Sequence, residues 1–336
     1  MEKLKWGILG TGFIANFFAE CMSLVPEAEK TAVSGTSLAK ANDFADKHGF
    51  AGRFEDFDEM LEKSDLDIAY IAVPNNLHFE YVSKALDAGL HVLCEKPIFD
   101  NELQLTAMID KAREKNLFLM EALWTRCFPA TLKARQWMDE GRIGQLRSVR
   151  ADFGIKATPG WQGWKASAEY SGGALRDVGI YALGMAFLGF QRQAPKEVIS
   201  SYFLKSGADY HSELLLKYED NCTAFLTGSF NMVTDHRAVF YGDKGTIILG
   251  PQLWHPSYAE LILYDPSDEF TRNSAEVFED NYESNGMQYE IAHVNECILA
   301  GARESSYFPL SESLELMRLT DSLRKEWGVR YASDTW

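Results

Sequence analysis

Two short segments carry side chains that together could move a proton during alcohol chemistry. Glu95-Lys96-Pro97 follows an apolar β-type run, while Asp177 and Tyr181 lie four residues apart in a later segment. Oxidising an alcohol removes its hydroxyl proton as hydride leaves, so a positioned base is needed. A tyrosine with an ordinary pKa of about 10 is a poor base at pH 7, unless a nearby ammonium stabilises its phenolate. Lys96 could supply such an ammonium to a tyrosine such as Tyr181, and Lys96 as the proton carrier is the alternative.

A glycine-rich turn near the start of the chain could hold the hydride carrier. Gly10-Thr11-Gly12-Phe13-Ile14-Ala15 follows the first β-type run and opens a helical pattern. In such a G-x-G-x-x-A pattern, the glycines permit a tight turn and a close backbone approach to a pyrophosphate at the helix N-terminus. The pattern predicts a dinucleotide site that includes Gly10, Gly12, Phe13 and Ile14, against the alternative of a merely structural turn.

The end of the second expected strand bears on which dinucleotide binds. An acid there would accept hydrogen bonds from the NAD ribose and would repel a 2′-phosphate. The segment from Val33 to Lys40 contains no acid, and Thr36, Ser37 and Lys40 could donate hydrogen bonds or charge to a phosphate. Because no arginine accompanies them, this turn favours NADP(H) over NAD(H) only modestly. Thr36 and Ser37 could instead belong to a loop and a helix N-cap.

Two differently built halves are needed to position these residues. From residue 4 to about 123, β-type runs alternate with helical periodicity, which predicts βαβ units and a parallel sheet covered on both faces. After Thr125 the runs are longer and strand-rich, with hairpin-turn residues between them. The prediction is an α/β chain with a Rossmann dinucleotide-binding domain at 1–124. An α+β domain at 125–336, with a large, mostly antiparallel open sheet, would bind substrate and form oligomers.

Composition excludes several classes of partner. The 336 residues include 33 Lys and Arg against 49 Asp and Glu, and the resulting net charge of -16 fits nucleic acid poorly. Apolar runs such as Ile68 to Val73 are too short to span a bilayer, and no signal-like segment precedes the first expected strand. The five cysteines are widely spaced and contain no CxxC. They indicate a reducing, cytoplasmic setting and no metal site.

Three further motifs connect these segments to a known family. They are Ala72-Val73-Pro74-Asn75-Asn76-Leu77-His78, the run from Ala88 to Glu95-Lys96-Pro97, and Ser171 to Tyr181. With the glycine turn, they resemble the glucose–fructose oxidoreductase, inositol dehydrogenase and MocA-type family over nearly the whole chain. The segment from Glu121 to Pro129 is similar to the branch of dimeric dihydrodiol dehydrogenases and NADP-linked D-xylose dehydrogenases. Many family members have His at the position of Tyr181, whereas the dihydrodiol dehydrogenase and glucose–fructose oxidoreductase branches have Tyr.

The resemblance implies an NAD(P)-dependent oxidoreductase that acts on a sugar, a polyol or a trans-dihydrodiol. It implies Tyr181 as the acid/base, Lys96 as its partner and Asp177 as a substrate-orienting residue. The further residues expected at the cofactor are Pro74, Asn75, His78, Glu95, Lys96, Trp124 and Arg126. The residues expected at the substrate are Trp124, Phe153 and Asp177. Asn75 and His78 could instead cap a helix near Phe79. Trp161 and Trp164 are also expected near the substrate cleft, with packing between the domains as an equal alternative.

Two alternative functions are also compatible with the sequence, and the sequence further predicts an oligomer. A non-catalytic redox regulator would keep the glycine turn, and a glycoside-cleaving enzyme would return the hydride without net cofactor reduction. The C-terminal half also contains aromatic residues on alternating strands, namely Phe225, Phe230, Phe240 and Tyr241. An open sheet with such a face needs cover, so we expect a homodimer or an even-numbered homo-oligomer formed through this sheet.

Overall fold

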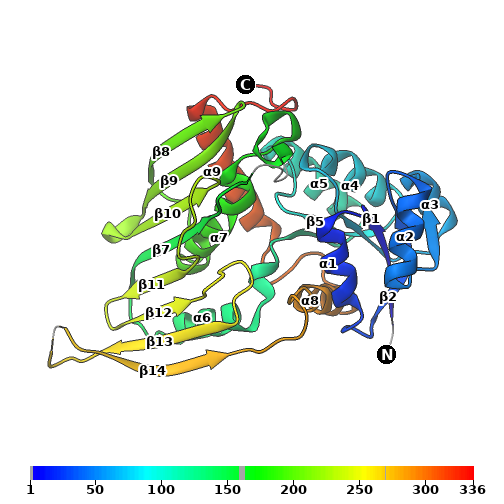
Figure 1. Ribbon diagram of the computed structural model, residues 1–336. Helices are drawn as coiled ribbons and strands as arrows, with labels where there is room; N and C mark the ends of the chain where they lie inside the picture. Colours follow the sequence, from blue (N-terminus) through cyan, green and yellow to red (C-terminus); the bar gives the residue numbers. More distant parts are fainter. Residues whose placement is uncertain (1–2, 159–162, 269) are drawn as a thin grey trace. The chain divides into compact units, whose positions relative to one another are not determined.

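The computed structural model describes residues 3–158, 163–268 and 270–336, and these residues form two compact units. The first unit runs to Trp124 and also contains Glu283–Leu314, while the second contains Thr125–Tyr282 and Glu315–Trp336. Each unit is built around one sheet (Figure 1). The sequence interpretation assigned all of 125–336 to the second domain, whereas Glu283–Leu314 packs with the first unit. Trp6 Nε1 donates to Asn295 Oδ1 at 3.0 Å there, which joins the first strand to the returning segment.

The sheet of the first unit is parallel throughout and has the strand order β3-β2-β1-β4-β5-β6. Its strands are β1 (Leu4–Leu9), β2 (Ala28–Ser34), β3 (Gly52–Phe54), β4 (Ile68–Ile71), β5 (His91–Glu95) and β6 (Leu119–Ala122). All four residues of β4 are buried, as expected for a strand that is covered on both faces. The predicted parallel sheet of the Rossmann type is therefore confirmed.

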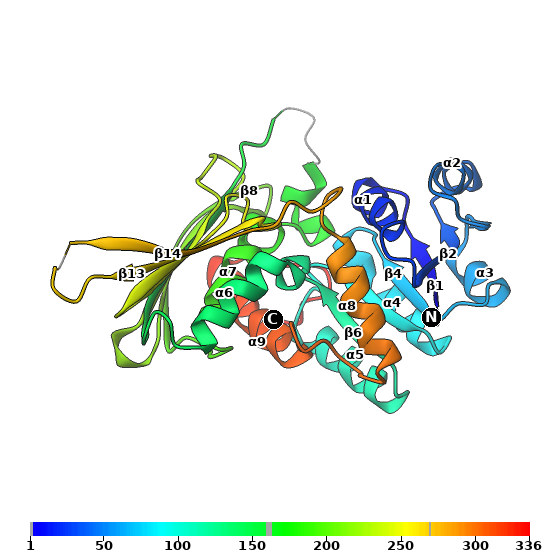
Figure 2. The same ribbon diagram turned by 90° about the horizontal axis from the view of Figure 1, so that it is seen from below.

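Several α-helices of the described residues lie wholly within the first unit. They are α1 (Phe13–Met22), α2 (Leu38–His48), α3 (Phe57–Lys63), α4 (His78–Asp87), α5 (Glu102–Glu114) and α8 (Gln288–Leu299). Helices α1 and α2 lie on one face of the sheet and α4 and α5 on the other (Figure 2). Ser37, Asp56 and Asn101 cap α2, α3 and α5 by accepting a backbone N–H three residues onward. The starts of these three helices thus follow from local sequence.

The second unit contains an eight-stranded mixed sheet with the order β14-β13-β12-β11-β7-β10-β9-β8. Only the β7–β10 pair is parallel, so the predicted mostly antiparallel sheet is confirmed. The strands are β7 (Leu146–Gly154), β8 (Glu197–Lys205), β9 (Ala208–Lys217), β10 (Thr223–Ser229), β11 (Ala238–Gly242), β12 (Gly245–Leu249), β13 (Tyr258–Tyr264) and β14 (Arg272–Glu279). Helices α6 (Pro129–Asp139), α7 (Ile180–Gly189) and α9 (Leu310–Trp327) lie on one face of it (Figure 2).

The two faces of this sheet differ in what covers them. On the helix-covered face, strand register aligns a fully buried row of Leu216, Ala224, Val149, Phe240, Ile247 and Leu261. On the opposite face, one residue away in each strand, lies a second row that we call the outer row. It consists of Ile199, Leu215, Phe225, Arg150, Val239, Ile248, Glu260 and Val277. Six of these eight side chains are apolar, although helices cover only the other face.

The aromatic face expected from the sequence is only half correct. Phe225 is 46% exposed in the outer row, and Tyr241 is half-buried on the same face. Phe230 and Phe240, by contrast, are fully buried. Phe240 has the opposite strand parity from Phe225 and so points toward the helices, which the aromatic composition of the segment could not reveal.

Candidate active site

The glycine turn has the geometry that a dinucleotide pyrophosphate needs. Gly10 has φ +115, and a Cβ at this position would lie 2.2 Å from the carbonyl oxygen of Ala72. Gly12 precedes α1, has no atom within 4 Å of an added Cβ, and leaves the helix N-terminus without a side-chain cap. Open space beside unsatisfied helix N–H groups suits an anionic ligand. Phe13 is exposed at the same turn and Ile14 is half-buried, so the residues present fit the predicted cofactor.

The turn after β2 holds the three residues predicted to contact a 2′-phosphate. Ser37 Oγ accepts the Lys40 N–H at 3.4 Å, and Lys40 Nζ donates to Thr36 Oγ1 at 3.0 Å. Ser37 thus has the helix-capping role that was its alternative interpretation. Glu55, one residue after β3, accepts the Leu38 N–H at 3.3 Å. The sequence analysis missed this carboxylate because no motif marks it. Its position beside the first turn of α2 follows from the parallel pairing of β3 with β2.

The loop that carries Lys96 is fixed by groups on both sides of it. Glu95 Oε2 accepts the Lys96 N–H at 3.2 Å, and Glu121 Oε1 accepts the Ile98 N–H at 3.1 Å. Glu95 Oε1 also accepts a hydrogen bond from the Tyr70 hydroxyl, at 2.5 Å in a buried contact. The backbone on which Lys96 stands is therefore anchored by two carboxylates. Glu95, predicted at the cofactor, is buried and performs this anchoring.

His78 is fully buried beneath the same loop. Its Nδ1 lies 3.1 Å from the carbonyl oxygens of Pro97 and Ile98, and its Nε2 lies 2.9 Å from that of Val73. Burial lowers the pKa of His78. The ring thus bridges the turn after β4 and the turn after β5 and does not cap α4, of which it is the first residue. Pro74 and Asn75 are half-buried in the first of these turns.

In the second unit, Asp177 and Tyr181 are placed by a local widening of a helix. Leu175–Gly179 forms a π-helical turn, which leads directly into α7. Such turns are rare and frequently mark functional sites. The Asp177 carboxylate lies 3.4 Å from Lys165 Nζ, and Tyr181 is 7% exposed near the start of α7. Both residues therefore belong to one continuous helical segment.

An aromatic cluster accompanies Tyr181. The rings of Phe153 and Trp254 are stacked at 4.0 Å between centroids and 9° between planes, and the Phe153 ring lies 5.6 Å from that of Tyr181. His236 contacts both stacked rings edge-on. Phe153 was predicted at the substrate, whereas Trp254 was missed. It lies on the connection between β12 and β13, outside every motif, and Thr125 Oγ1 fixes it by donating to its carbonyl at 2.7 Å.

The other predicted residues lie in varied surroundings. Trp124 is buried at the end of the first unit's main segment. Arg126, which was expected at the cofactor, is buried in the second unit and donates to the Gly184 carbonyl of α7 at 2.9 Å. Trp164 is half-buried with Lys165 Nζ 5.8 Å from its ring centre, and Trp161 lies outside the described residues.

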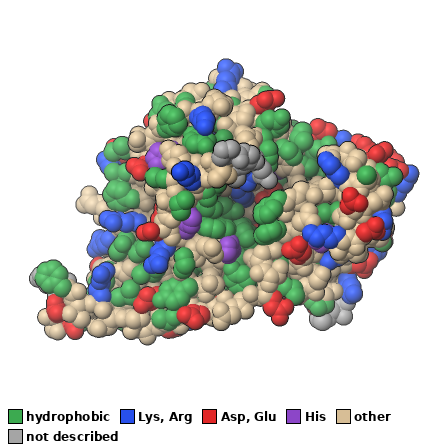
Figure 3. Space-filling model, in the orientation of Figure 1, with side chains coloured by type: hydrophobic (Ala, Val, Ile, Leu, Met, Phe, Trp, Pro, Cys, Tyr) green, Lys and Arg blue, Asp and Glu red, His purple; other side chains and the backbone are tan. Residues whose placement is uncertain are grey.

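Neither the surface charge on the face drawn in Figure 3 nor the described His, Cys, Asp and Glu side chains indicates a further ligand site. Lys and Arg side chains alternate with Asp and Glu over the face drawn in Figure 3. Within residues 3–158, 163–268 and 270–336, no three His, Cys, Asp or Glu side chains are grouped so as to hold a metal ion. No helix in the described part of the chain is both long and apolar enough to cross a membrane.

Comparisons with known proteins agree with this geometry. Residues 4–123 match the family described as "Oxidoreductase family, NAD-binding Rossmann fold", and residues 131–248 match "GFO/IDH/MocA C-terminal domain". The trans-1,2-dihydrobenzene-1,2-diol dehydrogenase of Bos taurus is 32% identical and that of Sus scrofa 33% identical, each over 98% of this chain and 99% of the relative.

Solved structures show the same fold. A 3-ketoreductase from Actinomadura kijaniata, in complex with NADP and TDP-benzene, is 26% identical with a TM-score of 0.84 over 96% of this chain and 98% of its own. A levoglucosan dehydrogenase, in complex with NADH and L-sorbose, has a TM-score of 0.86 at 18% identity over 97% of both chains. The second likeness concerns the fold alone.

Proposed function

The chain belongs to the GFO/IDH/MocA oxidoreductase family, and from this premise we propose that it oxidises a hydroxyl group of a trans-dihydrodiol, sugar or polyol with NADP⁺ or NAD⁺. The observation that carries the proposal is the helical segment with Asp177 and Tyr181 beside the stacked Phe153 and Trp254. A titratable hydroxyl next to a flat apolar surface suits a ring that carries hydroxyl groups.

The dinucleotide would be held by the backbone of the Gly10–Ile14 turn and by Thr36 and Lys40. A dinucleotide held there would supply hydride transfer to or from the substrate carbon. The open space at Gly12 and the uncapped start of α1 support this placement. For the 2′ position we propose a preference for NADP(H), supported by the Lys40 ammonium and by the Thr36 hydroxyl. The Glu55 carboxylate near Leu38 opposes that preference, which keeps it modest.

Tyr181 would accept the hydroxyl proton of the substrate, and the Lys96 ammonium would stabilise the resulting phenolate. Asp177 would orient a neighbouring substrate hydroxyl by accepting its hydrogen bond. The two anchored carboxylates that hold the Lys96 loop support a fixed position for its ammonium, because a rigid backbone limits the space that a long side chain can sample. Lys96 as the sole proton carrier remains the alternative that mutation distinguishes.

The identity of the substrate ring rests on the relatives. Those that are 32–33% identical over nearly the whole chain are named trans-1,2-dihydrobenzene-1,2-diol dehydrogenases. The Phe153–Trp254 pair offers a planar contact that suits a dihydrodiol ring, and it also suits the C–H face of a sugar. We therefore propose trans-dihydrodiols as the first candidate substrates and aldoses as the second.

The direct test follows nicotinamide absorbance with trans-dihydrodiols, pentoses, hexoses and polyols, each with NADP⁺ and with NAD⁺. The proposal expects net cofactor reduction with at least one member of the panel. Tight cofactor binding without net reduction, together with cleavage of an aryl glycoside, would favour the glycoside-cleaving alternative. Cofactor binding without turnover of either substrate type would favour the redox regulator.

We further propose a homodimer that is formed through the outer row in a reducing, cytoplasmic setting. Ile199, Phe225 and Val277 are each 46–49% exposed, and they lie on strands that span the whole sheet from β8 to β14. A self-complementary apolar row fits a two-fold interface. None of the five cysteines forms a disulfide, and four of them are buried, which suits a compartment where thiols stay reduced.

A further inference from the structure

The turn that precedes Tyr181 is held from behind by the C-terminal end of the chain. The Tyr331 hydroxyl donates to the carbonyl oxygen of Gly172 at 2.9 Å in a buried contact. Three residues onward, the Leu175 N–H donates to Asp209 Oδ2 at 2.5 Å, also buried. Gly172 and Leu175 bracket the entry into the π-helical turn that contains Asp177. Two residues distant in sequence thus determine where this turn starts.

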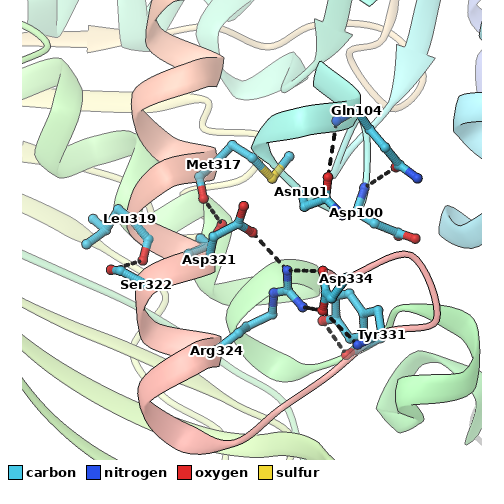
Figure 4. A network of polar contacts seen from close by, with 12 residues as sticks. Asp100, Asn101, Gln104, Met317, Leu319, Asp321, Ser322, Arg324, Tyr331 and Asp334 are labelled. Carbon is cyan, nitrogen blue, oxygen red and sulfur yellow. Dashed lines mark hydrogen bonds and ion pairs between the residues drawn. The ribbon is translucent and has the colours of Figure 1, made fainter. Parts of the chain in front are cut away.

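Tyr331 is itself fixed by a buried ionic cluster (Figure 4). Arg324 of α9 donates to both carboxylate oxygens of Asp334, at 2.7 and 3.2 Å, and to Asp321 at 2.8 Å. Asp334 also accepts the Tyr331 N–H at 2.8 Å, so a single carboxylate joins the helix to the C-terminal segment. The Arg324 and Asp334 side chains are completely buried. Two-point pairing of this kind fixes orientation as well as distance.

The Tyr331 ring links this cluster to the π-helical turn. The Arg324 guanidinium lies 4.0 Å from its ring centre, and the guanidinium of Arg176, which belongs to the turn, lies 5.1 Å from it. Both arginines are 1% exposed or less, so these cation–π contacts are desolvated. The ring therefore contacts the turn through a side chain, while its hydroxyl contacts the backbone.

The turn has little room to adjust if these contacts are lost. A Cβ at Gly172 would lie 2.4 Å from the Lys165 carbonyl oxygen. Gly173 has φ +148, and a Cβ there would lie 2.2 Å from Asp209 Oδ1. Backbone packed this closely transmits a displacement at one end to the residues that follow, because interiors have few voids to absorb it.

We propose that Tyr331 is a positioning residue for the reaction, and that it acts through the 172–179 turn on Asp177 and Tyr181. The cluster of Arg324, Asp334 and Tyr331 makes the C-terminal segment part of the catalytic support. This inference rests on the proposed function, in which Asp177 and Tyr181 contact the substrate. It assigns a role to residues that lie more than a hundred positions from any motif of the site.

The central experiment compares Tyr331→Phe with Ser200→Ala. The first variant keeps the ring and its cation–π contacts and removes the hydroxyl, which donates to Gly172 and also contacts the Arg176 side chain of the same turn. The second removes the hydroxyl that donates to Glu326 at 2.9 Å and accepts from Trp327 Nε1 at 2.9 Å, which ties the same helix to β8 away from the turn. Ser200→Ala therefore controls for a general loosening of α9.

For Tyr331→Phe we expect kcat with the best panel substrate to fall about tenfold, since small misplacements of reacting groups are costly. The Kd of the dinucleotide should stay within about twofold, because the proposed phosphate-binding turn belongs to the other unit. Ser200→Ala should lower the melting temperature by a similar few degrees and leave kcat unchanged. Unchanged kcat and KM in Tyr331→Phe, with a melting temperature lowered as in the control, would overturn the proposal.

Amide hydrogen exchange separates this inference from the proposed function because it needs no substrate. The peptide 171–182 should exchange faster in Tyr331→Phe than in the wild type or in Ser200→Ala. Asp334→Asn keeps the Tyr331 hydroxyl but weakens the pairing with Arg324 that fixes Tyr331, so it serves as a second variant and should have a smaller effect in the same direction. If no panel substrate is oxidised, the proposed function fails. If exchange of this peptide is unchanged in both variants, the positioning role fails.

Discussion

The two units hold the residues predicted for catalysis in different ways. In the first, the predicted groups are the glycine-turn backbone and side chains of the turns that follow neighbouring parallel strands, such as Gly10 packed against Ala72 and Lys96 beside Glu95. In the second, Asp177 and Tyr181 depend on a contact from β9 and another from the C-terminal segment. Locally built sites can be recognised from motifs, whereas assembled ones cannot. The following predictions test that contrast, from the largest expected effect to the smallest.

Tyr181→Phe should reduce kcat about 10²–10⁴-fold, the usual contribution of general acid–base catalysis, while the Kd of the dinucleotide changes little. Lys96→Met should also severely impair turnover. Steady-state kinetics of the double variant should show strong non-additivity, because either change disables the same proton transfer. Near wild-type turnover in Tyr181→Phe, at an unchanged melting temperature, would move the proton role to Lys96.

Phe225→Glu should convert the dimer into a monomer at micromolar concentration. The two-fold axis introduces the charge twice into an apolar interface, so we expect the dimer Kd to rise about 100-fold or more. Light scattering would report about 38 kDa for the variant. Thr36→Glu, in the other unit, is a charge-matched control that should stay dimeric, and a wild type that is monomeric at every concentration would contradict the proposed interface.

Gly10→Ala should weaken dinucleotide binding by roughly 10–100-fold and destabilise the first unit by about 2–4 kcal/mol, since the new methyl group meets the Ala72 carbonyl at a positive φ. Gly49→Ala is a matched control: its φ is +84, but nothing lies within 4 Å of an added Cβ. It should cost about 1 kcal/mol and leave binding intact. Calorimetric titration and thermal unfolding measure both quantities. Equal effects of the two variants would show that the close approach to Ala72 is unimportant.

Buried titratable groups should give the two units opposite pH dependences. Burial raises the pKa of Asp209 to about 6, so folding favours its protonated form, and its stabilising contribution declines as pH rises from about 4 through 6. Burial lowers the pKa of His293 to about 4, so its contribution is present above about pH 6.5 and declines as pH falls toward 4.

In the wild type, each group should change the free energy of unfolding by on the order of 2 kcal/mol between pH 4 and 6.5. Asp209→Asn and His293→Gln should each abolish one of these two changes. Urea denaturation at several pH values measures them, with the wild type as the reference. If both variants kept the wild-type pH dependence, neither residue would be responsible for it.

The smallest effect concerns the dinucleotide 2′ position. Glu55→Gln should improve NADP(H) affinity about threefold to tenfold without changing NAD(H) affinity, because a nearby negative charge is removed while the acceptor for the Leu38 N–H remains. Thr36→Asp should reverse the order and favour NAD(H). Calorimetric titration of both cofactors decides it, and a wild type that prefers NAD(H) would refute the NADP preference.

Two differences between the sequence interpretation and the structure have a common reason. The aromatic residues Phe230 and Phe240 were expected on the open face of the sheet and are buried, since strand register decides which face each residue occupies. Glu283–Leu314 returns to the first unit although it follows a long segment of the second. In both instances the deciding contacts join residues that are far apart in the chain.

The sequence by itself indicated the parallel sheet, the glycine turn and the family, because strand–helix alternation, the G-x-G-x-x-A spacing and the separate motifs can each be recognised along the chain. The π-helical turn with Asp177 is also a local segment, yet its support comes from Asp209, Arg324 and Tyr331. Only the tertiary structure decided this support, and it likewise decided the stacking of Trp254 on Phe153. Local hydrogen bonds are specified by spacing along the chain, whereas desolvated ion pairs and ring stacking depend on which distant segments folding brings together.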